Sequence, residues 1–236
     1  VGRVRRLYKA AKAGHAGTLD PMASGVLPIA FGEATKTVSY VMNGIKYYQF
    51  TIRWGEGRTT DDSEGEVTTI SEMRPSLTAV ELALKLFIGD IEQVPPIYSA
   101  IKIDGKRAYD LARSNVAVEL KPRSIHIKHF DLIAMPDRDH AIFEVVAGKG
   151  SYMRSLARDL ALHLGTVGHI SALRRLKVGP FDAKCSISLE KLEASGHSAK
   201  LADHLLAVES ALDDIPALDL TESEARNLQH GRSISI

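Results

Sequence analysis

The chain has 236 residues, 44% of them hydrophobic and 25% charged, which is the composition of a folded protein with one large domain, or one domain and a small appendage. Its single cysteine, Cys185, excludes an intrachain disulfide and favours a reducing compartment, which we expect to be the cytoplasm. No apolar run approaches the ~20 residues that a membrane helix needs, and no apolar stretch follows the basic N-terminus as in a signal peptide.

The net charge of +1 hides an alternation of charge along the sequence. Residues 1–60 carry 9 basic and 3 acidic side chains (+6), and residues 61–120 carry 6 and 11 (−5). Residues 121–180 carry 10 and 5 (+5), and residues 181–236 carry 5 and 10 (−5). The two basic segments suit a polyanion such as RNA, because cations that neutralise phosphates drive its binding. Charge blocks alone are more often solvated faces.

The first quarter of the chain alternates between apolar patterns and breaks. Val4, Leu7 and Tyr8 lie at helical spacing among arginines and lysines, which predicts a basic amphipathic helix running into the loop at Gly14. Residues 26–31 predict a short strand and residues 33–41 a short helix. Residues 46–54 alternate, with every second side chain from Tyr48 apolar, which predicts a strand with one buried face.

The middle of the chain predicts a polar loop over residues 55–66 and a helix that starts at a capping box of Thr78 and Glu81 and ends near Ile88. A strand to Ile103, a turn at residues 104–105 and a helix over 106–113 should follow. Alternation over residues 123–134 and 141–147 predicts two strands that flank a turn.

The last part predicts a helix over residues 152–164, ended by Gly165, and a strand over 173–178. A second capping box, Thr221 with Glu224, predicts a helix that stops at Gly231. Because strands and helices are mixed without a regular β-α-β alternation, the predicted fold class is α+β.

Residues 14–28 stand out, because the glycines and prolines within them impose an unusual backbone path. The residue before a proline favours extended geometry, so Asp20, which precedes Pro21, is expected at a turn and outside any helix. A carboxylate, the imidazole of His15 and two hydroxyls are held on this frame, and catalytic groups are often found on such loops. An Asp-Pro pair by itself is more often an ordinary turn.

The same stretch resembles the catalytic motif of the TruB family, the tRNA pseudouridine-55 synthases. Four further blocks resemble that family in the same order: residues 46–48, residues 94–102 with 105–109, residues 149–154 and residues 173–179. Five ordered motifs over residues 1–195 are a highly specific signal. The resemblance implies an isomerase that converts a uridine in the T loop of tRNA, at position 55, to pseudouridine.

That reaction breaks a C–N glycosidic bond, rotates the base and forms a C–C bond, without redox chemistry or hydrolysis. The resemblance implies that Asp20 is the catalytic carboxylate and that Arg154 lies beside it, where a guanidinium would pair bidentately with the ionised acid. Tyr48 resembles the active-site tyrosine that stacks on the target base and is a candidate to accept its C5 proton. Whether the carboxylate attacks the sugar or the base stays open.

The resemblance also implies three substrate-binding residues, and the local sequence suggests a fourth. A base inside folded RNA must be flipped out to be reached, and His15 resembles the residue that packs where the base leaves. Tyr152 would line the pocket, and Leu173 would form an apolar wall of it, with core packing as an equal alternative. Lys149 lies between two glycines in a segment that suggests phosphate binding without the spacing of a P-loop.

The implied architecture is the pseudouridine synthase fold: a mixed, largely antiparallel central sheet with flanking helices and a catalytic cleft. Residues 1–195 are expected to form the catalytic domain, with its N-terminal start missing. Residues 196–236 are expected to hold a helical segment and the incomplete beginning of a small RNA-binding domain. We expect a monomer that binds the T stem-loop of tRNA and no membrane.

No cofactor or metal is expected. Asp61, Asp62 and Glu64 lie close together in sequence, but they lack the ligand spacing of a calcium loop. The histidines, His126 and His129 among them, show no zinc-binding pattern.

Three other functions fit the sequence less well. A non-catalytic RNA-binding or RNA-folding module would need no Asp20, Tyr48 and Arg154 set. A guide-RNA-dependent rRNA pseudouridine synthase of the dyskerin type would need protein partners and different flanking segments. A retaining glycosidase would need two carboxylates ~5 Å apart, whereas only Asp20 has a motif around it.

Overall fold

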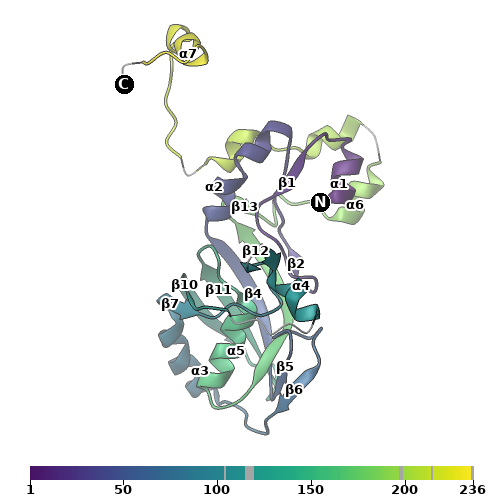
Figure 1. Cartoon of the computed structure of the whole chain (residues 1–236), viewed down its shortest axis with the longest axis vertical. Helices are drawn as coiled ribbons and strands as arrows, with labels where there is room; N and C mark the ends of the chain where they lie inside the picture. Colours follow the sequence, from purple (N-terminus) through teal and green to yellow (C-terminus); the bar gives the residue numbers. More distant parts are fainter. Residues whose placement is uncertain (104, 115–119, 197–198, 214, 235–236) are drawn as a thin grey trace.

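The computed structural model of the chain (Figure 1) describes residues 1–103, 105–114, 120–196, 199–213 and 215–234. Its α-helices are α1 Gly2–Leu7, α2 Val38–Asn43, α3 Leu77–Leu84, α4 Ala108–Arg113, α5 Met153–His163, α6 Leu189–Ala194 and α7 Glu222–Gln229. Its 3-10 helices are η1 Gly32–Lys36, η2 Lys85–Phe87, η3 Ala199–His204 and η4 Val208–Ala211. Its strands are β1 Ala13–His15, β2 Ser24–Gly25, β3 Ile29–Phe31, β4 Lys46–Trp54, β5 Glu56–Arg58, β6 Val67–Ile70, β7 Gly89–Gln93, β8 Lys102–Ile103, β9 Lys106–Arg107, β10 Arg123–Ala134, β11 His140–Ala147, β12 Gly168–Val178 and β13 Phe181–Asp182.

A seven-stranded sheet organises the fold. Its order is β13-β12-β4-β11-β10-β7, with every neighbouring pair along this path antiparallel. The short strand β2 pairs in parallel with β12, so that Gly25 lies opposite Arg175. This mixed, mainly antiparallel sheet with flanking helices confirms the predicted α+β class, and the β2 pairing attaches the Asp20 loop directly to β12.

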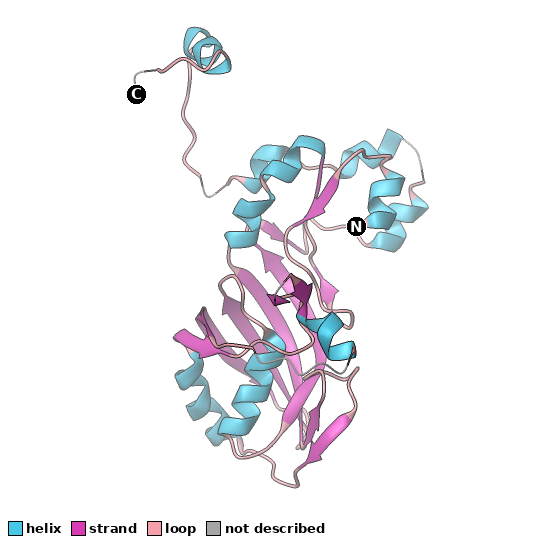
Figure 2. Cartoon of the chain, in the orientation of Figure 1, coloured by secondary structure: helices cyan, strands magenta, loops and turns pink. Residues whose placement is uncertain are grey.

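Helices α3 and α5 cover one face of the sheet, as Figure 2 shows in cyan over magenta. The core between the helices and the sheet buries aromatic side chains of β4, β10 and β11, and the rings of Phe50 and Phe143 stack at 5.5 Å. From α5, the buried side chains Leu156 and Leu160 lie one turn apart on the same stripe. Truncating such a side chain costs ~2–5 kcal/mol, so this stripe fixes α5 firmly on the sheet.

Most of the elements predicted from periodicity are confirmed. Strand β4 has the predicted bounds and buries Phe50, Ile52 and Trp54 on one face. Strand β10 begins and ends where predicted, and β11 begins one residue early, at His140. Helix α5 ends before Gly165, whose φ is +76°. The capping box of Thr221 and Glu224 is present at the start of α7.

Three predictions near the N-terminus were wrong in extent. The first helix stops at Leu7 instead of running towards Gly14. The strand predicted over residues 26–31 is only Ile29–Phe31, because Pro28 has no N–H and Val26 donates its own to Arg175 O at 2.8 Å. The helix predicted over residues 33–41 is split at Thr37, whose hydroxyl bonds back to Ala34 O at 2.9 Å.

Further corrections fall in the middle of the chain. The cap of α3 is Ser76, which accepts a bond from Ala79 N at 3.3 Å, and not Thr78. The α-helix ends at Leu84, and the 3-10 helix η2 continues it to Phe87. Gly89, whose φ is +95°, then begins strand β7. The strand predicted up to Ile103 is only Lys102–Ile103, after a proline-rich segment. The turn prediction falls partly on residue 104, outside the described residues.

Three further assignments were incomplete. The helix predicted over residues 106–113 begins only at Ala108, because Lys106–Arg107 form β9. The predicted polar loop over residues 55–66 contains β5, which pairs with the unpredicted β6. The strand predicted over residues 173–178 begins earlier, at Gly168.

Helix α7 lies apart from the sheet in Figure 1. Within the described residues, no helix is both long enough and apolar enough to cross a membrane.

Candidate active site

Asp20 lies at a turn in a loop whose two limbs are bonded to the rest of the fold. The Asp20 carbonyl accepts the N–H of Ala23 at 2.9 Å, which closes a turn over Pro21 and confirms that Asp20 is outside a helix. Gly25 has a φ of +107°, and a Cβ there would lie 2.1 Å from the carbonyl oxygen of Arg175. Only glycine allows this close approach, so the loop lies directly against β12.

The carboxylate of Asp20 is paired with Arg154 through two parallel hydrogen bonds. Arg154 Nε donates to Asp20 Oδ2 at 3.0 Å, and Nη2 donates to Oδ1 at 2.8 Å. Arg154 is 4% exposed and is the second residue of α5, whereas the Asp20 side chain is 27% exposed. The geometry orients the carboxylate and leaves part of it open to a reactant.

The remaining donors of Arg154 bind backbone carbonyls from two other segments. Nη1 donates to Thr60 O at 3.0 Å, and Nη2 also donates to Tyr98 O at 2.9 Å. The buried Asp62 carboxylate lies nearby, with Oδ2 3.7 Å from Arg154 Nε. One guanidinium therefore joins the Asp20 loop, the loop after β5 and the segment after β7.

The acids of that loop face arginines and backbone donors. Asp62 Oδ1 accepts bonds from Thr60 Oγ1 at 2.5 Å and from Glu64 N at 3.0 Å. Asp61 pairs with Arg158 at 3.0 Å; burial raises the pKa of Asp61, and Arg158 opposes that rise. Within the described residues, no group of three or more His, Cys, Asp or Glu is placed to hold a metal ion.

Tyr48 lies on β4 opposite Arg175 of β12. Burial raises the pKa of the Tyr48 hydroxyl; the Arg175 guanidinium lowers it, and the Asp20 carboxylate raises it further. Tyr48 therefore lies within the electrostatic reach of both charged groups, on the face of the sheet that carries the core.

Tyr152 immediately precedes α5 and is held by a buried glutamine. Gln93 Oε1 accepts the Tyr152 N–H at 2.9 Å, and Gln93 Nε2 donates to the Tyr152 carbonyl at 3.1 Å. Burial is the main cause that raises the pKa of the Tyr152 hydroxyl; more weakly, the Arg154 guanidinium lowers this pKa and the Asp20 carboxylate raises it. The structure thus brings Asp20, Arg154, Tyr48 and Tyr152 into one site.

The other three predicted residues have different positions. Leu173 is buried in the main core, against which Tyr48 and Met22 also pack, so it borders the site and fills the core at once. His15 lies in the small β1–β3 sheet, and its buried Nδ1 has no hydrogen-bond partner in the described part of the chain. Lys149 is exposed and donates to Asn43 Oδ1 at 3.2 Å, outside the Asp20–Arg154 pair.

A buried lysine lies two residues before Tyr48. Lys46 donates to the carbonyls of Met42 and, at 2.7 Å, Gly44. Burial and the charges of Arg175 and Lys149 lower its pKa to about 8. The β4 end of the site is therefore electropositive even where its side chains are covered.

Sequence reasoning missed Arg175, Asp62 and Lys46 as parts of this site. All three are charged residues that the fold buries. Arg175 and Lys46 lie within the quoted motifs, and Asp62 was considered only as a metal ligand. The one signal in the sequence is a charged residue at a position where the predicted strand or loop should be buried. For Arg175 that signal was present, because it falls on the same strand face as Leu173.

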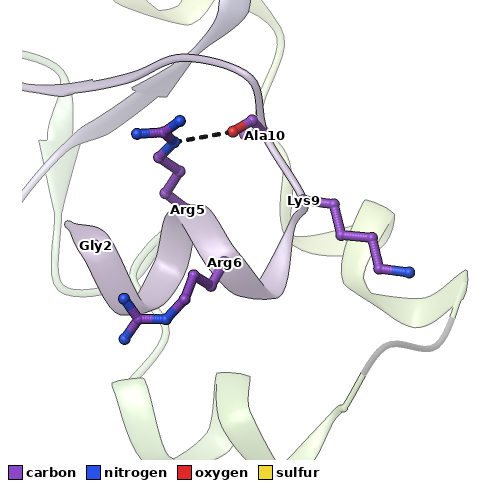
Figure 3. A pocket seen from close by; sticks show the side chains of 5 residues that line it. All are labelled: Gly2, Arg5, Arg6, Lys9 and Ala10. Carbon is purple, nitrogen blue, oxygen red and sulfur yellow. Dashed lines mark hydrogen bonds between the residues drawn. The ribbon is translucent and has the colours of Figure 1, made fainter.

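A shallow hollow of about 400 Å³ lies against α1, and Asp20 is not among the residues that line it. Its lining includes three cationic side chains, Arg5, Arg6 and Lys9, which point in different directions in Figure 3. Arg5 Nε donates to Ala10 O at 3.1 Å. This surface belongs to the basic N-terminal segment and is suited to contacts with an extended polyanion.

Similarity to known proteins identifies the family of this chain. The model of the N-terminal domain of the TruB family pseudouridylate synthases matches residues 5–153, and that of the tRNA pseudouridylate synthase B C-terminal domain matches residues 154–213. The resemblance predicted from the five motifs is confirmed.

Full-length relatives named tRNA pseudouridine synthase B match the whole chain. The protein of Rhodospirillum rubrum is 59% identical over 236 residues, covering 100% of this chain and 77% of its own length. That of Gluconacetobacter diazotrophicus is 58% identical, with 100% and 78% covered, and that of Bradyrhizobium diazoefficiens is 56% identical, with 99% and 69% covered.

Solved structures agree on the fold. A chain in a crystal structure of a Cbf5–Nop10–Gar1 complex superposes with a TM-score of 0.73 at 26% identity. A chain of an H/ACA RNP bound to a substrate RNA containing 2′-deoxyuridine gives 0.71 at 24%. These matches cover 98% and 99% of this chain but only 62% of each solved chain.

Proposed function

Because the chain belongs to the TruB family of pseudouridylate synthases, we propose that it isomerises the uridine at position 55 in the T loop of tRNA to pseudouridine, with Asp20 as the catalytic carboxylate. The observation that carries this proposal is the two-bond pairing of a partly exposed Asp20 with the buried Arg154. A carboxylate that is ionised, aimed and still reachable is what the reaction needs.

The chemistry follows from the residues around that pair. The ionised Asp20 acts on the nucleotide while the C–N bond breaks, and the freed base rotates to present C5 to the sugar. In this proposal Tyr48, half-buried and near Asp20, stacks on the base, and its hydroxyl oxygen accepts the C5 proton as the hydroxyl passes its own proton to water. N1 of the released base takes up a proton in exchange, so the product has the same atoms as the substrate. The choice between attack on the sugar and attack on the base stays open in this proposal.

The substrate-binding roles are proposals of the same kind. Tyr152 and Leu173 line the pocket of the flipped-out base from the start of α5 and from β12. His15 packs against the RNA where the base leaves. Lys149 and the cations of α1 contact phosphates, so binding should weaken as salt rises.

The wider assignments stay predictions. We propose that residues 1–195 form the catalytic domain, that residues 196–236 begin an RNA-binding domain, and that the protein acts as a monomer in the cytoplasm. We also propose that catalysis needs no cofactor or metal, which a chelator control during the assay would test.

The test is incubation of the chain with a T-stem-loop RNA, without guide RNA, followed by mapping of pseudouridine at single-nucleotide resolution. Modification at the position equivalent to 55 is expected, and none in an RNA with cytidine there. Activity only after addition of a guide RNA would favour the dyskerin-type alternative. Tight binding with no modification would favour the RNA-binding module.

A further inference from the structure

Arg175 is a buried charged residue to which the proposed chemistry gives no task. It lies on β12 and is 2% exposed. It faces Tyr48 of β4 on one side and Gly25 of β2 on the other. The pairing of β12 with β4 shifts register between Arg175 and Lys177, and such an irregularity re-aims side chains next to active sites.

The guanidinium of Arg175 binds both limbs of the Asp20 loop. Before Asp20, Nη2 donates to Gly17 O at 3.0 Å and Nη1 donates to Thr18 O at 3.2 Å. After Asp20, Nε donates to Val26 O at 2.9 Å. One rigid planar group therefore fixes the distance between the two ends of the loop that presents the carboxylate.

The same side chain reaches the second reacting group of the site. Tyr48 lies opposite Arg175 in the sheet, and its hydroxyl is within the influence of the guanidinium charge. Arg175 thus contacts the frame of Asp20 and faces Tyr48, whereas Arg154 contacts the Asp20 carboxylate itself.

If Arg175 had a purely structural role, burying its charge among these partners would cost free energy without a functional return. Among the residues that the structure describes, Arg175 forms no ion pair with an aspartate or glutamate, so its charge is buried against neutral carbonyls. An arginine cannot lose its proton to relieve that cost. A neutral hydrogen-bonding residue would hold the loop more cheaply, so the persistent cation and its fork point to a task in the site.

We propose that Arg175 is a positioning residue of the reaction, which holds the Asp20 loop and Tyr48 in the relative placement that isomerisation requires. This inference rests on the proposed roles of Asp20 and Tyr48. It predicts that losing the fork slows the chemical step while RNA binding stays near its wild-type strength, because small misplacements of reacting groups are costly.

The test compares Arg175→Met with Arg174→Met, which removes the same charge from the adjacent, exposed position of β12. Single-turnover rates at saturating T-stem-loop RNA and the Kd for that RNA are measured for both. For Arg175→Met we expect a rate ~100-fold lower with a Kd within about threefold of wild type. Arg174→Met should keep the wild-type rate. An unchanged rate for Arg175→Met, or a loss confined to Kd, would overturn the proposal.

Arg175→Lys keeps the charge with a single ammonium that cannot reach three carbonyls. We expect its rate between those of the Met variant and wild type, and it decides the matter if Arg175→Met does not fold. A wild-type rate for Lys would overturn the role of the fork, and failure of both variants to fold would make Arg175 purely structural. An active Asp20→Asn would count against the proposed function itself; an inactive one beside a fast Arg175→Met would refute only this inference.

Discussion

Two buried arginines, Arg154 and Arg175, bind the Asp20 loop in different ways. Arg154, from α5, pairs with the Asp20 carboxylate and has a second carboxylate, Asp62, within 3.7 Å. Arg175, from β12, donates to three backbone carbonyls of the loop. Both side chains are almost inaccessible, at 4% and 2% exposed.

The difference separates two tasks that a catalytic loop needs. The Arg154 side controls the charge and direction of one reacting side chain, because a bidentate ion pair orients both. The Arg175 side controls where the loop backbone lies relative to β4 and β12. Changes on the first side should affect the reacting group directly, whereas changes on the second should act through its position.

The largest effect on the reaction rate should come from the Asp20 carboxylate, whose loop both arginines bind. Asp20→Asn keeps the shape of the side chain but removes its charge, so turnover should fall by at least ~1,000-fold with RNA binding nearly intact. Asp20→Glu keeps the charge and displaces it by one methylene, which should still cost ~100-fold. Single-turnover rates on a T-stem-loop test both. Turnover by Asp20→Asn within tenfold of wild type would show that Asp20 is not the catalytic carboxylate.

The next largest effect should come from Arg154. Arg154→Lys keeps a cation but loses the two-bond fork, so activity should fall by a large part of the ~3–5 kcal/mol typical for a broken buried pair. Arg154→Met should be worse, since it leaves Asp20 and Asp62 near each other with no cation between them. RNA affinity should change less than the rate. Equal rates for Arg, Lys and Met would show that Asp20 is held by another group.

A smaller effect, on the Arg175 side, should follow from Gly25→Ala. The added Cβ would lie 2.1 Å from Arg175 O, at a φ of +107°, so β2 must move away from β12 and carry the loop with it. We expect a rate ~10–100-fold lower, with the thermal unfolding midpoint also reduced. Gly32→Ala is the matched control, because it has a positive φ and no atom within 4 Å of its Cβ. If both variants lose the same activity, strain alone explains the loss.

The surroundings of Arg154 and of Arg175 differ in how far the sequence could predict them. The alternation of β4 placed Tyr48 on the buried face, and the Asp-Pro pair placed Asp20 at a turn, both from local chemistry. The pairing of Asp20 with Arg154 came only from the family resemblance, because 134 residues separate them.

The role of Arg175 could not be predicted in that way. Its partners are the carbonyls of Gly17, Thr18 and Val26, which every residue possesses and which leave no trace in the sequence. Asp62 was missed for a related reason: the loop that brings it to Arg154 turns at Asp61, a non-glycine residue with a φ of +59°. Backbone partners and unusual backbone angles are tertiary properties.

His169 extends the comparison along β12. Like Arg175 it is buried, at 1% exposed, and bonded to a carbonyl, with Nδ1 2.8 Å from Glu56 O. Burial lowers the pKa of His169, against a smaller opposite effect of the Glu56 carbonyl. A histidine can give up its proton to avoid a buried charge, whereas Arg175 cannot. One strand therefore buries one neutral and one permanently charged group.

The smallest predicted effect tests that contrast through the pH dependence of stability. The folded-state pKa of His169 lies below its unfolded value of 6.5, so the unfolded chain takes up the proton first as pH falls. The stability that neutral His169 supports is present above about pH 6.5 and is lost progressively below it. His169→Gln, which can still donate to Glu56 O, should lose less stability than wild type between about pH 7 and pH 5.5. Urea unfolding at both pH values measures this, with the exposed His230→Gln as control. If His169→Gln and wild type lose equal stability, His169 takes up its proton in the folded chain as readily as in the unfolded chain. Strand β12 would then accept a second buried cation besides Arg175, and the contrast between the two residues would not hold.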